Sequence, residues 1–276
     1  MPACCVEAVP HSGLGNWLYV AAEVALVAKA YNCTLVLPAA LHRWFRLPPH
    51  ARRPGAAPLA CREVRSMQEA SSNEHTRRRA TRAMGARSFE DARARMFRRL
   101  FGLPRPSPQA PVRFGTSVHV RTVSDVHCHT HTDIRSCRRG CLRDEALHCV
   151  VRHALPPVLI LSDSAKAGAK LRRMLLQREI RDVWDETDIV DARNHSALSR
   201  QAAHQTMLLW AAFVAAERRF ASGVSTFSKS ALLAIPHQGT RTRGGDYVVD
   251  TRCAKTHETD GNLYACRRAV LSRDLV

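Results

Sequence analysis

The stretch Cys4-Cys-Val-Glu-Ala-Val-Pro10, followed by His11-Ser-Gly-Leu-Gly-Asn16, decides the fold. The first part is a short apolar run, and the part with two glycines signals a turn. Over residues 17–31 apolar side chains recur at i, i+3 and i+4 without Gly or Pro, which predicts a helix. Thr34-Leu-Val-Leu37, closed by a proline, is typical of a buried parallel strand. We therefore expect a strand, a Gly loop, a helix and a second strand, which together make a βαβ unit.

The rest of the chain continues this alternation. We expect strands at 117–121, 158–161 and 180–184, and helices at 165–177, 206–216 and 229–234. The Pro-rich run at 104–111 is the best linker candidate. Strands that alternate with helices predict parallel sheets. The expected architecture is α/β, with an N-terminal Rossmann-like half (1–110) that carries the Gly loop and the basic helix, and a C-terminal Rossmann-like half (111–276).

The charge balance is strongly basic, with a formal net charge of +18. Lys and Arg both serve in phosphate binding, yet this chain has 37 Arg and only 5 Lys. This bias favours compositional drift, and we expect nucleic acid to be an unlikely partner. Residues 76–101 form an Arg-rich helical stretch with an apolar stripe at Ala83, Phe89, Ala92, Met96 and Leu100. A solvated face of an amphipathic helix is the simpler interpretation of this stretch, and a polyanion site is the alternative.

Compartment signals conflict. We see no apolar run long enough to span a bilayer and no signal peptide. The ten cysteines form disulfides in an oxidising lumen, and they stay free or bind metal in the cytosol. The triplets at Asn32 and Asn194 are glycosylation sequons and lean toward the lumen. Localisation is thus open between the Golgi or ER lumen, if the chain is a fragment of a secretory enzyme, and the cytoplasm.

Three loops carry candidate chemistry, and each stands between a strand and a helix or at the end of a strand. Gly13, Gly15 and Asn16 lie where backbone N–H groups meet an anion. His119 and Arg121 share one face at the end of a strand, and the planar guanidinium suits a pyrophosphate. Ser225, Thr226, Phe227 and Ser228 enter a helix and supply hydroxyl and N–H donors. A tight turn, an exposed strand end and an ordinary N-cap are the alternatives.

In order and spacing over residues 4–235, these loops resemble those of the GDP-fucose-dependent fucosyltransferases, including the protein O-fucosyltransferases and the α-1,2- and α-1,6-enzymes. Gly13-Leu-Gly-Asn16 is similar to their opening Gly loop, and His119-Val-Arg121 to their His-x-Arg motif. Leu161-Ser-Asp163 resembles a later strand that ends in Asp, and Gly223 to Ser228 resembles their Gly-Ser-Ser/Thr-Phe-Ser loop.

The resemblance implies a GT-B-like fold with GDP-fucose in a central cleft between two Rossmann-type halves, of which the C-terminal half (111–276) is the nucleotide-sugar-binding one. It also implies inverting transfer to a glycan or protein hydroxyl. It implies that no cofactor and no metal is required. Arg121 would grip the β-phosphate and Asp163 would read the guanine edge. Gly15 and Asn16 would border the sugar and the pyrophosphate, and His119 and the 225–228 loop would surround the nucleotide.

Some residues depart from the family pattern. Trp17 stands where many members have Gln, and Asp125 is displaced from its usual place after the His-x-Arg motif. Asp125, His127 and Glu145 all remain candidates for the general base, with Asp125 taken as the first choice. The alternative function is a non-catalytic module that binds polyanions through the basic helix. A second alternative concerns residues 127–153, whose Cys and His suit zinc, disulfides or free thiols.

Overall fold

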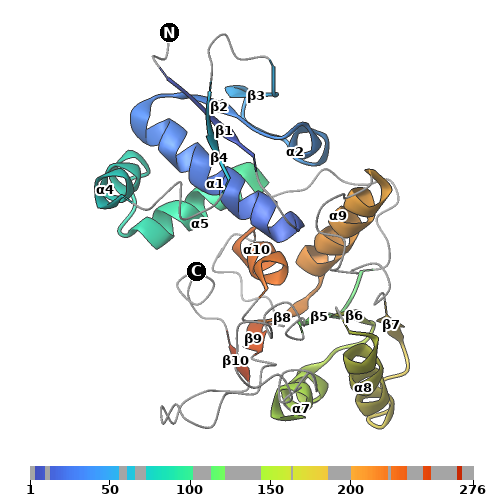
Figure 1. Ribbon diagram of the computed structural model, residues 1–276. Coiled ribbons are helices and arrows are strands. Elements are labelled where there is room, and N and C mark those ends of the chain that lie inside the picture. The colour runs from blue at the N-terminus through green and yellow to red at the C-terminus, as the bar shows by residue number, and fades with distance from the viewer. Residues whose placement is uncertain are drawn as a thin grey trace, which may run out of the picture.

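The computed structural model describes residues 4–9, 13–55, 61–65, 73–101, 113–121, 144–162, 164–185, 200–222, 225–234, 245–249 and 266–268. The protein is an α/β structure with two separate sheets built mainly from parallel strands (Figure 1). This confirms the predicted class. No helix in the described part of the chain is long and apolar enough to cross a membrane.

The first sheet has the strand order β3-β2-β1-β4, and its pairs are all parallel. It contains β1 (Cys5–Ala8), β2 (Thr34–Val36), β3 (Ala51–Arg52) and β4 (Arg62–Val64). The helices of this region are α1 (Leu14–Tyr31), α2 (Ala39–Trp44), α4 (Glu74–Ala83) and α5 (Phe89–Phe101). The predicted βαβ unit is therefore present, as β1, α1 and β2.

The second sheet has the order β10-β9-β8-β5-β6-β7, in which only the β9–β10 pair is antiparallel. Its strands are β5 (Thr116–Val120), β6 (Val158–Ser162), β7 (Val183–Asp185), β8 (Arg218–Ser222), β9 (Gly245–Val249) and β10 (Cys266–Arg268). Its helices are α7 (Asp144–His153), α8 (Ala165–Leu176), α9 (Arg200–Ala215) and α10 (Thr226–Ala234).

The core connects the two sheets. On one face of the second sheet, Val118, Ile160 and Phe220 pack with side chains of α7 and α8. On the other face, Leu159, Leu161 and Ala221 belong to a larger core that includes α1, α5, α9 and α10. Helices α9 and α10 thus lie between the second sheet and the helical layer of the first (Figure 1). The predicted linker at 104–111 lies outside the described residues.

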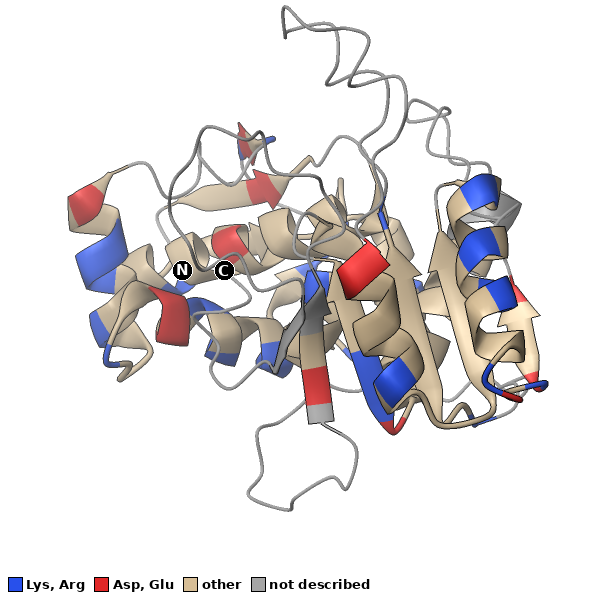
Figure 2. Ribbon diagram, turned by 90° about the horizontal axis from the view of Figure 1, so that it is seen from below, with Lys and Arg blue, Asp and Glu red and all other residues tan. Residues whose placement is uncertain are grey.

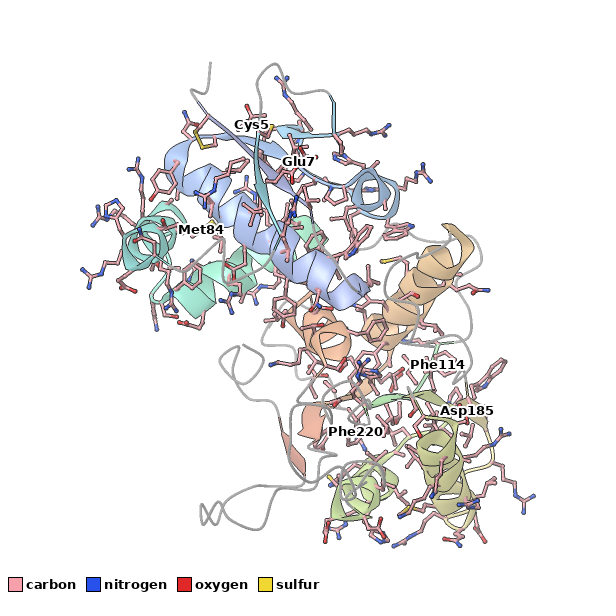
Figure 3. The ribbon with its side chains drawn as sticks, in the orientation of Figure 1. Cys5, Glu7, Met84, Phe114, Asp185 and Phe220 are labelled. Carbon is pink, nitrogen blue, oxygen red and sulfur yellow. A yellow bond between two sulfur atoms is a disulfide. The ribbon has the colours of Figure 1, made fainter. Side chains whose placement is uncertain are left out.

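Two disulfides hold the start of the first sheet. Cys4 bonds to Cys33 before β2, and Cys5 bonds to Cys61 before β4 (Figure 3). The two adjacent cysteines at the start of β1 therefore tie this strand to its neighbours on both sides. All four of these cysteines are oxidised, which the sequence left undecided.

Three details differ from the sequence expectations. The Arg-rich stretch is two helices rather than one, because the chain turns at Gly85, whose φ is +56°. Ala83, expected in the apolar stripe, is exposed, whereas the stripe residues of α5 are buried. Helix α7, which the sequence did not predict, occupies the end of the Cys/His-rich segment.

Candidate functional site

The strand orders place a switch point in each sheet. In the first sheet β2 and β3 lie on one side of β1, and β4 lies on the other. In the second sheet β6 and β7 lie on one side of β5, and β8 and β9 lie on the other. Ligands of open α/β sheets bind beyond the carboxyl ends of the strands at such a point. Two of the predicted loops follow β1 and β8 at these two switch points, and His119 and Arg121 lie at the end of β5.

The first loop leads directly into α1. Gly13 is the N-cap of this helix, and its carbonyl accepts hydrogen bonds from the backbone N–H groups of Asn16 and Trp17, at 3.0 and 3.2 Å. The helix begins at Leu14, three residues earlier than expected. Asn16 consequently lies inside the first turn and does not cap the helix.

Gly15 lies in close contact with α10, across the junction between the two halves of the chain. A Cβ atom built on Gly15 would lie 2.3 Å from the backbone nitrogen of Phe227 and 2.4 Å from the carbonyl carbon of Thr226. Only glycine permits this contact between the first turns of α1 and α10. A Cβ on Gly13 would meet nothing within 4 Å. The two glycines therefore have different roles, and packing accounts for Gly15 without a ligand.

The loop at 225–228 forms the start of α10. Ser225 is buried, its N–H donates to the Ser222 carbonyl at 3.1 Å, and its own carbonyl accepts from the Lys229 N–H at 3.1 Å. Ser228 is buried and Thr226 and Phe227 are partly buried. One turn further on, the Ser230 hydroxyl donates to the Phe227 carbonyl at 2.6 Å.

Trp210 fixes this helix from α9. Its indole Nε1–H donates to the Ser230 hydroxyl at 2.9 Å, and both side chains are buried. Trp210 lies in the apolar helix that the sequence predicts at 206–216, and the sequence alone suggests no role for it. The signal was present, because a buried indole N–H needs an acceptor, and Ser230 lies close behind the 225–228 loop.

His119 joins β5 to α10. Its Nδ1 is hydrogen-bonded to the Ser228 hydroxyl at 3.0 Å, and its ring lies 5.2 Å from the Phe227 ring, centroid to centroid. The side chain is 1% exposed. Burial, together with the positive charge of Arg121, lowers the pKa of His119 to about 3. The imidazole is therefore neutral at physiological pH and offers one donor and one acceptor.

Arg121 is the first residue after β5 and is half-buried. It lies at the carboxyl edge of the second sheet, close enough for its charge to act on His119. The structure thus brings Gly15, His119 and the 225–228 loop into one contact network, with Arg121 at its edge.

The electrostatics of this junction favour an anion. The first turns of α1 and α10 meet at Gly15 and Phe227, and neither turn contains an acidic residue. Each helix N-terminus carries a partial positive charge of roughly half an elementary charge. Two such ends, with the Arg121 guanidinium nearby and the neutral His119 imidazole against α10, create a positive potential that a phosphate group would balance.

The remaining predicted site residues are placed as follows. Asp125, His127 and Asp163 lie outside the described residues. Glu145 is exposed in the first turn of α7, and α7 covers the face of the second sheet opposite α10. Among the described residues no group of three or more His, Cys, Asp or Glu side chains is arranged to hold a metal ion. Within the Cys/His-rich segment, Cys149 is disulfide-bonded.

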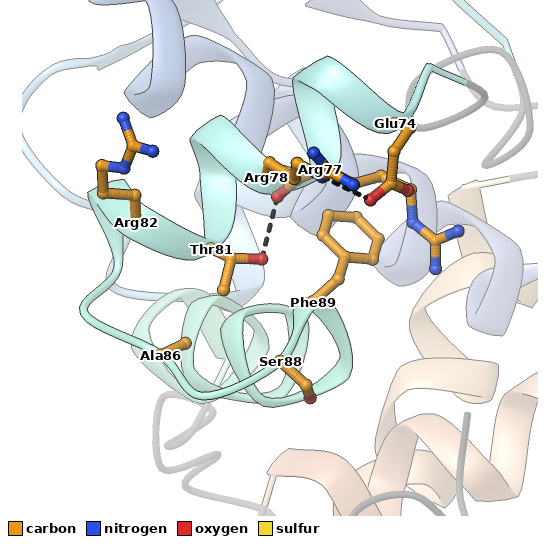
Figure 4. Close-up of a pocket in the computed structure, with 8 residues that line it drawn as sticks. All are labelled: Glu74, Arg77, Arg78, Thr81, Arg82, Ala86, Ser88 and Phe89. Atoms are coloured by element: carbon orange, nitrogen blue, oxygen red, sulfur yellow. Dashed lines mark hydrogen bonds and ion pairs between the residues drawn. The ribbon is translucent and has the colours of Figure 1, made fainter.

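A surface pocket of about 500 Å³ lies elsewhere, between α4 and α5 (Figure 4). It contains none of the predicted site residues. We place the candidate site at the junction rather than in this pocket, because the two switch points and the convergent polar groups meet at the junction.

No family model matches this sequence, and no curated protein matches it significantly.

Proposed function

We propose that this protein binds a nucleotide-sugar at the junction of α1, β5 and α10, and that the donor is GDP-fucose. The observation that supports this most is the meeting of two acid-free helix N-termini at a pair of sheet switch points. This arrangement suits a ligand with a pyrophosphate and little other charge. Fucose, rather than another sugar, rests on the resemblance of the four motifs to the fucosyltransferases.

In this proposal the two sheets act as the halves of a GT-B-like enzyme, with the donor held between them. Arg121 contacts the β-phosphate and stabilises the negative charge that develops as GDP departs. The neutral His119 donates or accepts a hydrogen bond without adding charge, and Ser228 holds its ring in place. An acceptor hydroxyl attacks the anomeric carbon in line and inverts it, with no metal required. Gly13, Asn16, Ser225 and Thr226 border the donor, Asp163 reads the guanine, and Asp125 is the proposed base.

The disulfides support an oxidising compartment as the site of folding, since such bonds rarely persist in the cytosol. We therefore favour the lumen of the secretory pathway over the cytoplasm. Alkylation of the denatured, unreduced protein should leave Cys4, Cys5, Cys33 and Cys61 unmodified. Modification of these four residues in material from native cells would argue for a reducing compartment.

The donor proposal is tested by thermal unfolding with GDP, GDP-fucose, GDP-mannose and UDP-glucose. A ligand that binds only the native state raises the Tm, by an increment that grows with its concentration relative to Kd. We expect GDP and GDP-fucose to raise it and UDP-glucose to have little effect. Release of fucose or its transfer to an acceptor should then disappear in Arg121→Ala. An unchanged Tm at millimolar GDP would reject the donor site.

A further inference from the structure

The basic pocket between α4 and α5 is separate from the junction and has its own chemistry (Figure 4). Arg77, Arg78 and Arg82 line it, together with the Thr81 and Ser88 hydroxyl groups. Residues 73–101 contain nine arginines and three acidic residues, which leaves six unbalanced positive charges. Figure 2 shows Lys and Arg along these two helices and, at the opposite side of the molecule, along α8.

We infer that this pocket binds the sulfate groups of a sulfated polysaccharide. Guanidinium groups match the geometry of oxyanions by donating two parallel hydrogen bonds. Arg78 and Arg82 stand four residues apart on α4, so that these two occupy one face of the helix, and Arg77 lies beside that face. A single sulfate contacts Arg78 and Arg82 at once, and a group on a neighbouring sugar reaches Arg77.

The arginines of the pocket differ in how readily they can bind a sulfate group. The Arg78 Nε donates to Glu74 Oε1 at 3.0 Å, and these two side chains are 78% and 64% exposed. An ion pair this exposed contributes little, and a sulfate replaces the carboxylate readily. Arg82 is exposed and makes no ion pair with a described residue. Arg78 and Arg82 therefore carry most of the binding.

The other arginines of α4 have structural roles. Arg79 donates to the Ala30 carbonyl at 2.6 Å, and its guanidinium lies 4.7 Å from the Tyr31 ring centroid. Arg77 lies 4.9 Å from the Phe89 ring centroid and is paired with Glu90 at 3.3 Å. These contacts hold α4 against α1 and α5, and they set the shape of the pocket.

A polysaccharide fits the pocket better than a nucleic acid does. Single-stranded nucleic acids bind through aromatic side chains on which the bases stack. Phe89, the one aromatic residue that lines the pocket, is buried and has the Arg77 and Arg93 guanidinium groups on its ring. The pocket thus offers charge without a stacking surface. The disulfides also favour a compartment that contains sulfated glycans rather than nucleic acids.

The test is the affinity of the full chain for a size-defined heparin oligosaccharide at 0.15 M NaCl, with a single-stranded oligonucleotide of equal charge as the second probe. We expect the double variant Arg78→Ala/Arg82→Ala to bind heparin about fivefold to tenfold more weakly. The matched control is Arg172→Ala/Arg173→Ala on α8, which removes two arginines that are also exposed. This control should change the affinity less than twofold.

A third variant changes the affinity in the opposite direction. Glu74→Gln removes the carboxylate that competes for Arg78 and should tighten heparin binding about twofold. If both double variants lost heparin affinity equally, net charge alone would account for the binding, and the proposed sulfate site would be overturned. No measurable heparin binding, or tighter binding of the oligonucleotide through Arg78 and Arg82, would overturn it as well. None of these outcomes depends on nucleotide binding at the junction.

Discussion

The first four strands of each sheet are arranged in the same order, but the two sheets differ in how they are held together. In the first sheet the strands are two to four residues long, and two disulfides join the start of β1 to the segments before β2 and β4. In the second sheet β5 and β6 pair over five residues and are completely buried. Long buried strands gain stability from packing, whereas short strands gain it here from covalent bonds that restrict the unfolded chain. Where the two halves meet, α1 and α5 pack against α10, and Gly15 lies directly against the α10 backbone.

The largest effect is expected at that glycine. Gly15→Ala places a methyl group 2.3 Å from the Phe227 nitrogen and 2.4 Å from the Thr226 carbonyl carbon. Both are backbone atoms of α10, which cannot move away easily. We expect a loss of about 3 kcal/mol or more in the free energy of unfolding, measured with urea. Gly13→Ser is the matched control, since its site is open and Ser is a good N-cap. If both variants were equally stable, Gly15 would not lie against the α10 backbone in the folded protein.

The disulfides rank second. Replacing Cys5 and Cys61 by Ser should destabilise the protein by about 2 to 4 kcal/mol in the same urea experiment, because the closed loop spans 56 residues. The pair Cys4 and Cys33 closes 29 residues and should cost about 0.6 kcal/mol less. If only the replacement of Cys4 and Cys33 lowered the free energy of unfolding, the disulfides would not act by restricting the unfolded chain.

The buried imidazole gives a pH-dependent effect. The pKa of His119 is about 3 in the folded protein and about 6.5 when unfolded, so that the unfolded state takes up the proton first. Above pH 6.5 the titration of His119 does not lower the free energy of unfolding. As the pH falls from 6.5 toward 3, protonation of His119 in the unfolded state lowers this free energy progressively. Between pH 7 and 5 the stability advantage of the wild type over His119→Asn should narrow by about 2 kcal/mol. A constant difference between the two proteins across this range would mean that His119 titrates normally.

The smallest effect is expected at the edge of the second sheet. Trp184 in β7 is 44% exposed, and its ring lies 6.1 Å from the Phe114 ring, edge to face. Because the side chain keeps much of its contact with water when folded, Trp184→Ala should cost less than about 1 kcal/mol in urea unfolding. A loss as large as that of Gly15→Ala would show that this edge is part of a core or an interface.

The sequence predicts the fold best where a local apolar pattern is enough to determine a helix or a strand. The apolar period of residues 17–31 and the run at 34–37 gave α1, β2 and the parallel pairing with β1. The loops after β1 and β8 and the end of β5 were expected to converge, and Gly15, His119 and Phe227 are in contact.

Other features depended on distances that a sequence does not contain. The sequence predicts that Gly15 borders the donor, and it gives no sign that the α10 backbone lies against this glycine. The disulfide partners of Cys4 and Cys5 follow from the order of the strands in the sheet. The spacing of cysteines along the chain does not reveal that order. The break at Gly85 was missed because a helical pattern continues on both sides, and a single positive φ changes its direction.

The central claim is that the junction binds the diphosphate of a GDP-sugar through Arg121. The most direct measurement is a calorimetric titration of GDP into the wild type, Arg121→Ala and Arg172→Ala, the last being an exposed arginine on α8. We predict saturable one-to-one binding to the wild type and to Arg172→Ala. Arg121→Ala should bind at least tenfold more weakly, since an interaction with an ionised group contributes about 1.5 to 3 kcal/mol. Absence of binding to the wild type, or equal affinity in Arg121→Ala, would contradict the claim.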